Sequence, residues 1–241
     1  EIDKGIDIAD SIANRRPHLA RLMATVNDGP ADEETRREIG MVLEIVRLDQ
    51  RLSALALYDL RGELVAMSGE FLREPFAVSL RHPENATLKW QDGFYLELAA
   101  TMQQQGKKIG TVRIEYPPVT LTAAFLNYQN NGETGETALC AALTSEQMRC
   151  FPTRHRPQPF DSPRSVDGKA LPLSLAIDGE SGAIMATDYR AQDVFDAYSP
   201  VGNSGLVMVM KIDQAELRRP IHQHLLWIVP LFAGLLALGF A

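Results

Sequence analysis

Basic residues are scarce in this sequence, and their scarcity narrows the partners open to it. The chain has 24 Lys and Arg residues against 31 Asp and Glu residues, which gives a formal net charge of −7. No run of Lys or Arg relieves this acidic balance. Nucleic acids and anionic lipids select basic surfaces, so we expect neither to be the main partner.

The motifs of the common catalytic and metal centres are also missing. No GxSxG, HExxH or phosphate-binding glycine loop occurs. The histidines have no carboxylates at metal-ligand spacing; they are His18, His82, His155, His222 and His224. The last two lie two residues apart on an expected helix and so face different sides. The sequence therefore predicts no metal, no cofactor and no enzyme activity in this chain.

Only two cysteines are present, Cys140 and Cys150, in the stretch LCAALTSEQMRC. A turn over residues 144–147 would fold this stretch into a hairpin, with the cysteines directly opposite or one residue out of step. A disulfide is within reach if they form a non-hydrogen-bonded pair, whose Cβ atoms lie close together. It would indicate an oxidising compartment. Two buried thiols are the alternative.

An uninterrupted apolar run, LLWIVPLFAGLLALGFA, occupies residues 225–241. A spanning helix needs about 20 apolar residues, so we expect the start of a transmembrane helix here, with Trp227 at the headgroup level. A buried core helix is the alternative, and Pro230 and the lack of a polar face count against it. The chain begins at Glu1 with neither Met nor signal peptide, so we expect a fragment of a larger membrane protein.

The first 50 residues have helical periodicity. Apolar residues recur about every seven positions along residues 1–27, and Pro17 is expected to kink or restart that helix. It is interpreted as a helix packed along a sheet, as a dimer-forming stalk, or as both at different heights. A second amphipathic helix is predicted to follow Asp32 and to end near Asp49.

Strand patterns fill the middle of the chain. Residues 52–69 predict a hairpin around a turn at 59–62, residues 70–87 look irregular, and further strands are expected up to Pro117. The membrane-distal unit is therefore placed at residues 51–118.

The next segment repeats this plan as a membrane-proximal unit at residues 119–213. It begins with a short helix at 119–128 and the cysteine hairpin. A proline-rich surface loop at 152–165 and a strand pair around 178–182 are expected next. Two strands joined at 202–205 complete it.

A helix is expected to leave the second unit at its C-terminal end. Asp213 is predicted to cap it, with Glu216 completing a capping box. Residues 214–241 would then join the second unit rigidly to the membrane. The predicted fold class is α+β, with antiparallel sheets on a long N-terminal helix.

Several segments resemble the double Cache family of bacterial extracytoplasmic sensor domains. They are GETGE (132–136), DGESGAIMATDYRAQDVFDAYSPV (178–201) and MKIDQAELRRPI (210–221), with a match in layout at 58–66 and 97–116. Ala191 stands where the family pattern usually has Gly after DYR. The resemblance implies two PAS-like units, outside the cytoplasmic membrane. No match to the family's amino-acid-binding motif is found in the distal half.

Two groups of polar and aromatic residues are the candidate ligand contacts. In the proximal unit they are Asp188, Tyr189, Arg190 and Tyr198, where Arg190 could clamp a carboxylate. In the distal unit they are Tyr58, Trp90, Tyr95 and Arg113. Arg113 helps only if the pocket lies on the sheet face opposite the N-terminal helix. A structural hydrogen-bond network is the alternative for the proximal group.

Together these features predict a periplasmic sensing domain of an inner-membrane receptor, working as a homodimer. The expected partners are a small organic acid or amino acid and the membrane. The resemblance implies a cytoplasmic output such as a diguanylate cyclase or phosphodiesterase in cyclic di-GMP signalling, a histidine kinase or a chemoreceptor. The rival hypotheses are a module that binds only proteins and a membrane-tethered hydrolase.

Overall fold

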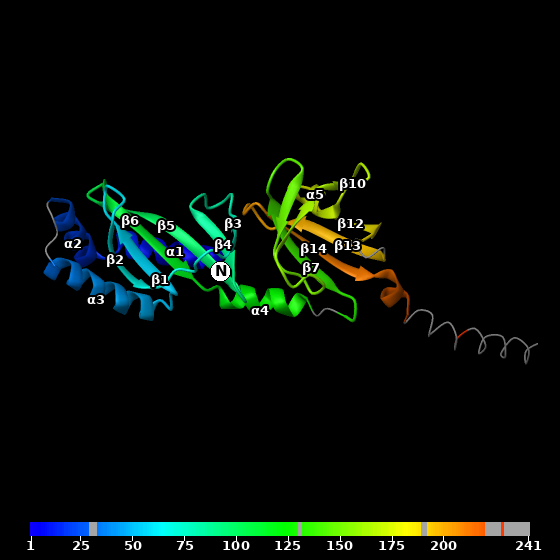
Figure 1. The fold of residues 1–241 in the computed structure, drawn as a ribbon, viewed down its shortest axis with the longest axis horizontal. Helices are drawn as coiled ribbons and strands as arrows, with labels where there is room; N and C mark the ends of the chain where they lie inside the picture. Colours follow the sequence, from blue (N-terminus) through cyan, green and yellow to red (C-terminus); the bar gives the residue numbers. More distant parts are fainter. Residues whose placement is uncertain (29–32, 130–131, 189–191, 220–227, 229–241) are drawn as a thin grey trace, which may run out of the picture. The chain divides into compact units, whose positions relative to one another are not determined.

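The computed structural model describes residues 1–28, 33–129, 132–188, 192–219 and 228, and they fall into two units (Figure 1). Unit 1 is Glu1–Ala124 and unit 2 is Phe125–Ala241. Both have antiparallel sheets with helices, as the α+β prediction required. No helix among the described residues has the length and apolarity needed to cross a membrane. The apolar run at 225–241 lies outside the described residues, apart from Ile228.

Unit 1 is built on a six-stranded antiparallel sheet with the order β2-β1-β6-β5-β4-β3. Its strands are β1 (Ala54–Tyr58), β2 (Leu64–Gly69), β3 (Phe76–Ser79), β4 (Ala86–Trp90), β5 (Phe94–Gln104) and β6 (Lys107–Tyr116). The predicted hairpin at 52–69 is confirmed as β1 and β2, and Gly62 supplies the positive φ of its turn. The interpretation of 70–87 as irregular was wrong for β3, which pairs with β4 at the sheet edge.

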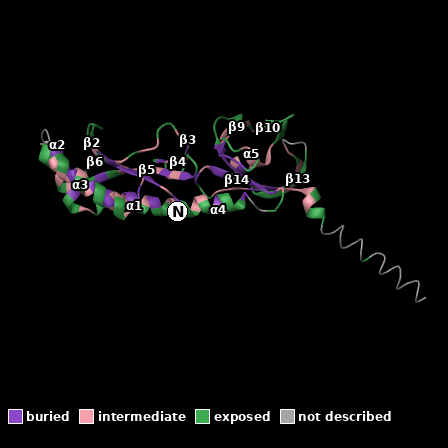
Figure 2. Ribbon diagram, turned by 60° about the horizontal axis from the view of Figure 1, so that its bottom comes forward, coloured by how far each residue is buried: buried purple, intermediate pink, exposed green. Residues whose placement is uncertain are grey.

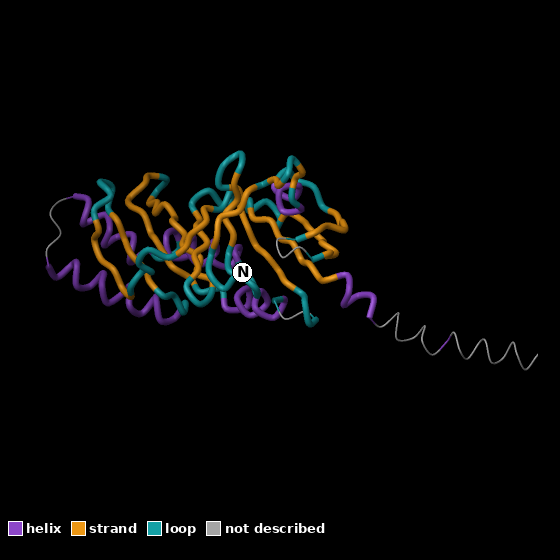
Figure 3. Tube along the Cα trace, turned by 45° about the vertical axis from the view of Figure 1, so that its right-hand side comes forward, coloured by secondary structure: helices purple, strands orange, loops and turns teal. Residues whose placement is uncertain are grey.

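Three helices cover one face of this sheet: α1 (Ile2–Asn14), α2 (Pro17–Asp28) and α3 (Glu33–Asp49) (Figures 2 and 3). The long N-terminal helix is therefore two helices, because Pro17 has no N–H and restarts the chain at a first helical position. Gly5 lets α1 approach β5, since a Cβ there would lie 2.8 Å from Leu98 Cδ1 and 3.0 Å from Leu96 Cδ2. The helices thus lie on the face of Leu96 and Leu98.

Unit 2 has a second six-stranded sheet, with the order β12-β13-β14-β7-β8-β9. Its strands are β7 (Glu136–Ala142), β8 (Gln147–Cys150), β9 (Phe160–Pro163), β12 (Gly182–Thr187), β13 (Asp193–Pro200) and β14 (Leu206–Asp213). In each unit the first strand pairs with both the second and the last, so five strands of the two sheets follow one order. This agreement confirms the predicted repeat. The helix α4 (Val119–Tyr128) is also confirmed.

The strand pair predicted around 178–182 was half wrong, because α5 (Pro172–Ile177) is a helix. Pro172 stands at its first turn, where a missing N–H costs nothing. The buried small residues Ser174 and Ala176 let the helix pack on β13 and β14. The alternation in LSLAI is equally compatible with a short helix, and packing against the sheet decides between them.

The proline-rich stretch at 152–165 was predicted to be entirely loop, which is wrong for β9. Phe160 pairs with Cys150 and Pro163 with Gln147. β9 is an edge strand of the sheet, where proline is tolerated because one side of the strand needs no hydrogen-bonded neighbour. A small hairpin, β10 (Ser165–Val166) and β11 (Lys169–Ala170), follows it.

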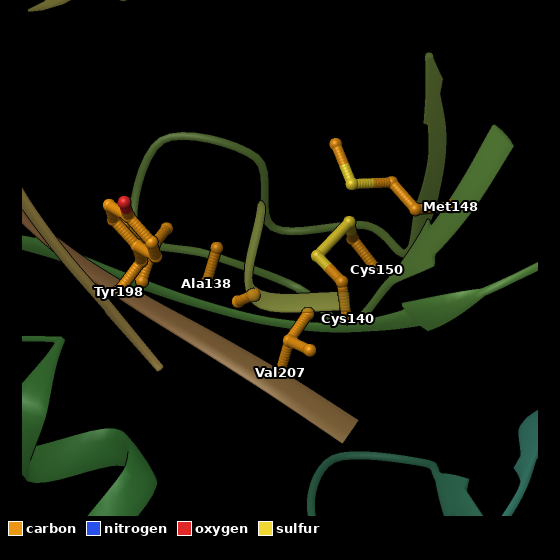
Figure 4. Packing of buried hydrophobic residues seen from close by; sticks show 8 residues of the cluster. Ala138, Cys140, Met148, Cys150, Tyr198 and Val207 are labelled. Carbon is orange, nitrogen blue, oxygen red and sulfur yellow. A yellow bond between two sulfur atoms is a disulfide. The ribbon is translucent and has the colours of Figure 1, made fainter. Parts of the chain in front are cut away.

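The predicted disulfide is confirmed, and it lies in the core of unit 2. Cys140 and Cys150 are directly opposite on β7 and β8, with 4.0 Å between their Cα atoms. Both residues are fully buried. Figure 4 shows the bridge among the apolar side chains of its cluster, which include Ala138, Met148, Tyr198 and Val207.

Candidate ligand-binding site

A cavity of about 340 Å³ lies in unit 2, on the sheet face that α5 covers. Its apolar wall comes from the strands and from the segment leading into α5; this wall includes Ala138, Met148, Val209, Phe160, Leu171 and Leu173. Its polar wall carries more acidic than basic side chains. A cavity of this size, apolar with a few polar groups, is typical of a small-molecule site.

Strand register brings three charged residues of the polar wall into one row. Lys211 on β14 pairs with Glu136 on β7 on one side and with Asp196 on β13 on the other. Residues paired directly across strands point to the same face of a sheet. Asp188, just beyond the end of β12, adds a third carboxylate to this wall.

Lys211 is engaged by two of these carboxylates. Its Nζ lies 2.6 Å from Glu136 Oε2 and 3.2 Å from Asp188 Oδ2. Glu136 also accepts hydrogen bonds from the Thr153 hydroxyl and, at 3.2 Å, from the His155 N–H. Burial alone would raise the pKa of Glu136, but these donors and Lys211 outweigh it and hold that pKa below its usual value.

Asp196 is the exception in the row. The residue is only 6% exposed, and within the described part of the chain its Oδ1 has no hydrogen-bond partner. Burial raises the pKa of Asp196 to about 6; Lys211 opposes the rise, and the charges of Asp188 and Glu136 add to it. A buried carboxylate without a donor is costly, so this oxygen marks a position where a ligand can bind.

The other charged residues of the cavity wall, Asp161 and Arg156, contact neighbouring side chains. Asp161 on β9 forms a two-point ion pair with Arg149, at 2.9 and 3.1 Å. The Arg156 guanidinium lies over the Phe160 ring, 4.8 Å from its centroid. Such a stacked arginine combines an apolar surface with a charge at the same wall.

The predicted proximal residues do not all lie at this cavity. Asp188 lines it. Tyr198 packs on the same face but within the apolar cluster around the disulfide (Figure 4). Tyr189 and Arg190 lie outside the described residues.

The predicted distal residues divide between the two faces of the unit 1 sheet. Arg113 pairs with Ala99 and with Ala56, so it lies on the sheet face opposite the helices. Tyr58 and Tyr95 share that face by alternation. Trp90 lies on the opposite face, where its ring meets Phe94 edge-on at 4.8 Å.

On the sheet face that carries Arg113, unit 1 holds a network of four charged residues. Lys89 forms ion pairs with Glu97 and, at 2.8 Å, with Glu115. Arg113 lies 2.6 Å from Glu97. Burial works against ionised Glu97, but Arg113 and Lys89 more than compensate and keep its pKa below the usual value. The network therefore balances two cations with two carboxylates.

The loop after β2 covers this network. The Phe71 ring lies under Lys89 and Arg113, at 5.8 and 4.8 Å from its centroid. The Leu72 N–H donates to both oxygens of Glu115 at 3.2 Å. These contacts close the network with groups of unit 1 itself.

The exit from unit 2 differs from the predicted capping box. Residues 214–219 are helical, directly after β14. The Glu216 carboxylate accepts from the Glu133 N–H at 2.9 Å and from the Thr134 N–H at 2.7 Å, and the Thr134 hydroxyl also donates to it. The Asp213 N–H donates to that hydroxyl at 3.0 Å. The GETGE segment thus holds the start of the exit helix, because its backbone N–H groups are free to bind a carboxylate.

The comparisons with known proteins found structures but no sequence family. No family model and no curated protein matches the chain. It is similar to the sensory domain of the Campylobacter jejuni chemoreceptor Tlp3 with isoleucine bound, at a TM-score of 0.47 and 13% identity over 88% of this chain and 87% of that one. It is also similar to the extracellular domain of mmHK1S-Z2, which is described as a histidine kinase, at 0.45 and 13% over 89% and 92%.

A third similar structure is the ligand-binding domain of the Pseudomonas fluorescens chemoreceptor CtaA in complex with L-serine. Its TM-score is 0.42 and its identity 13%, over 82% of this chain and 86% of that one. The two chemoreceptor structures are thus described as a sensory domain and a ligand-binding domain, and the mmHK1S-Z2 structure as an extracellular domain.

Proposed function

We propose that this chain is the small-molecule-sensing domain of a bacterial transmembrane receptor and that its ligand binds in the unit 2 cavity. The observation that carries the proposal is the buried Asp196 Oδ1, which has no hydrogen-bond partner among the described residues and lies in the wall of an apolar cavity of about 340 Å³. A cavity that served only as packing would gain nothing from such a group, whereas a binding site uses it to recognise a ligand.

The cavity wall is close in sequence to the exit helix. Lys211 and Asp213 lie two residues apart on β14, and the helix begins at Gln214. Glu136, the partner of Lys211, lies two residues after Thr134, which binds Glu216. A ligand that moves Lys211 relative to Glu136 therefore shifts the two strand ends that hold the exit helix.

The energy required for such a response is modest. A tenfold change in the populations of two signalling states needs about 1.4 kcal/mol of differential binding. One or two hydrogen bonds made in only one state supply that amount. The cavity offers enough polar groups for this difference.

We further propose where the domain lies in the cell, how it pairs and where its signal goes. The domain lies in the periplasm, and residues 225–241 continue into the inner membrane. Two copies pair through helices that include residues 1–26 and 214–224, and the signal passes to a cytoplasmic output module. That module is a diguanylate cyclase or phosphodiesterase, a histidine kinase or a chemotaxis module.

A thermal-shift screen with organic acids, amino acids, amines and purines tests the site. A ligand at 100 times its Kd is expected to stabilise the domain by about 2.7 kcal/mol. Ala186→Trp, which fills the cavity from the edge strand β12, is expected to abolish the shift produced by any hit.

Ala183→Trp is the matched control, because residue 183 lies on the same strand but faces away from the cavity. A hit that Ala186→Trp leaves unchanged would contradict the cavity as the site. The absence of any hit, together with a tight protein partner, would favour an interaction module. Hydrolysis of generic esters or phosphoesters would favour the hydrolase.

A further inference from the structure

We infer that the ligand of the unit 2 cavity carries a protonated amino group and that Asp196 Oδ1 receives it. This inference rests on the proposed function and adds the chemical class of the ligand. It depends on three features of the cavity: the unsatisfied oxygen, the charge balance of the wall and the apolar surface opposite.

Lys211, the lysine beside Asp196, does not donate to Asp196 Oδ1. Lys211 is its direct partner in the register of β13 and β14, yet the Lys211 Nζ lies between Glu136 and Asp188. Each of those contacts is a charge-assisted bond, and turning toward Asp196 would break at least one of them. Asp196 therefore needs a donor from outside the described chain.

The charged groups of the wall favour a cation as that donor. Asp161 is neutralised by Arg149. Among the described residues, the remaining wall has three carboxylates, Glu136, Asp188 and Asp196, and two cations, Lys211 and Arg156. A ligand cation beside Asp196 would meet an opposite charge, whereas a ligand carboxylate there would meet a like charge. An ammonium group supplies both the charge and three donors.

A bare metal ion fits the same wall poorly. Among the described residues no group of histidine, cysteine or carboxylate side chains is placed to hold a metal. The Lys211 ammonium occupies the position between two of the carboxylates, where a metal would need them both. An organic cation needs only one free carboxylate oxygen and uses the apolar wall as well.

The apolar wall sets the rest of the ligand. Met148, Phe160 and Leu173 line the cavity together with the polar row. The volume of about 340 Å³ is at the small end of ligand sites. We therefore expect a small amine with a short aliphatic or aromatic body.

Three probes of one shape and different charge test the inference: butylamine, butanol and butyrate. Their binding to the whole chain is followed by chemical-shift titration at pH 7.5. Butylamine is expected to bind at least tenfold more tightly than the other two and to shift the signals of cavity residues. Asp196→Asn is expected to weaken butylamine at least tenfold and to change butanol less than twofold.

Asp193→Asn is the matched control, since it makes the same change on the same strand but on the opposite face. It is expected to leave butylamine binding unchanged. Lowering the pH from 7.5 to 5 is expected to weaken butylamine binding, because Asp196 gains a proton. The groups facing Asp196 are Glu136 on β7, Lys211 on β14 and Asp188 after β12, and α5 contributes no titratable side chain.

Tighter binding of butyrate, or equal butylamine binding by Asp196→Asn, would overturn the amine inference while leaving a ligand cavity in place. Binding of calcium chloride that depends on Asp196, without amine binding, would overturn it in favour of a metal site. The proposed function has a separate test: it fails if Ala186→Trp abolishes the thermal shift of no compound in the wider screen.

Discussion

The two units of this chain share one strand order and differ in how they satisfy the charged face of their sheets. In unit 1 Lys89 and Arg113 bind Glu97 and Glu115, and the loop with Phe71 and Leu72 covers them. In unit 2 Lys211 serves two carboxylates and a third, Asp196, keeps an oxygen without a donor. A duplicated sheet can thus become a closed ion network or an open site through the balance of a few buried charges.

The difference extends to what covers each face. Unit 1 uses a loop whose Leu72 N–H and Phe71 ring contact the network directly. Unit 2 uses α5 and the segment leading into it, which leave a cavity between themselves and the strands. Unit 1 therefore depends on its ion pairs for stability, whereas unit 2 carries a carboxylate, Asp196, whose burial costs stability.

Lys89→Met is expected to have the largest effect on this comparison. The substitution leaves Glu115, which is fully buried, without its ion-pair partner. Removing one partner of a buried pair costs about 3–5 kcal/mol, because the other charge stays desolvated. Hydrogen exchange of the unit 1 strands, measured residue by residue, is expected to accelerate accordingly.

Lys107→Met is the control, because Lys107 is exposed at the start of β6 in the same sheet. It is expected to change stability by less than about 0.5 kcal/mol. Equal effects of the two substitutions would show that the Lys89 network contributes little, and the contrast between the units would then be lost.

Asp196→Asn is expected to have a smaller effect, of the opposite sign. Burial raises the pKa of Asp196 to about 6, from 3.8, so the folded state holds this proton more tightly than the unfolded state. The ionised group therefore destabilises the fold, by on the order of 3 kcal/mol well above pH 6 and not at all below about pH 4. The variant is expected to be more stable than the parent at pH 7.5 and equal to it at pH 4.

Urea unfolding of unit 2 at both pH values measures this difference, and Asp193→Asn again serves as the control. A stability gain that persists at pH 4 would mean that the ionisation of Asp196 is not its cause. A loss of stability at pH 7.5 would mean that Asp196 has a donor, which would also remove the basis of the amine site.

Much of the fold was accessible from local sequence patterns. The hairpin at 52–69, the last strands of both units and the cysteine pair follow from alternation and turn residues over short windows. The helix α5 was missed because the apolar pattern of its six residues is compatible with either a strand or a short helix. Packing of Ser174 and Ala176 on the sheet selects the helix, and the sequence pattern alone does not show this packing. The strand β9 was missed because proline excludes a central strand but not an edge strand.

The site was less accessible, although the sequence contains a signal for it. Asp196 and Lys211 occupy the same face of the sheet as buried apolar residues two or four positions away along each strand. These are Val194 and Tyr198 in β13, and Val207 and Val209 in β14. A charged residue at such a position predicts a buried ion pair or a site. Which residues pair depends on the register of β13, β14 and β7, and this long-range pairing is absent from any local window.

The smallest expected effect concerns the ends of the last strands, which the two units secure differently. In unit 1 the Tyr116 hydroxyl, at the end of β6, donates to the Glu1 carboxylate at 2.9 Å. In unit 2 the Thr134 hydroxyl joins the Asp213 N–H to Glu216 of the exit helix. Thr134→Val removes only that hydroxyl, which is worth about 1 kcal/mol, so the amides of residues 213–219 are expected to exchange about fivefold faster.

Thr101→Val, on an exposed position of β5, is the control for losing a hydroxyl. Exchange at residues 213–219 is expected to stay at the parent rate in that variant. If Thr134→Val instead leaves the exit helix unchanged and loosens β7, the hydroxyl stabilises the sheet alone. Coupling between the cavity and the exit helix would then have to run through Lys211 and β14 without the GETGE segment.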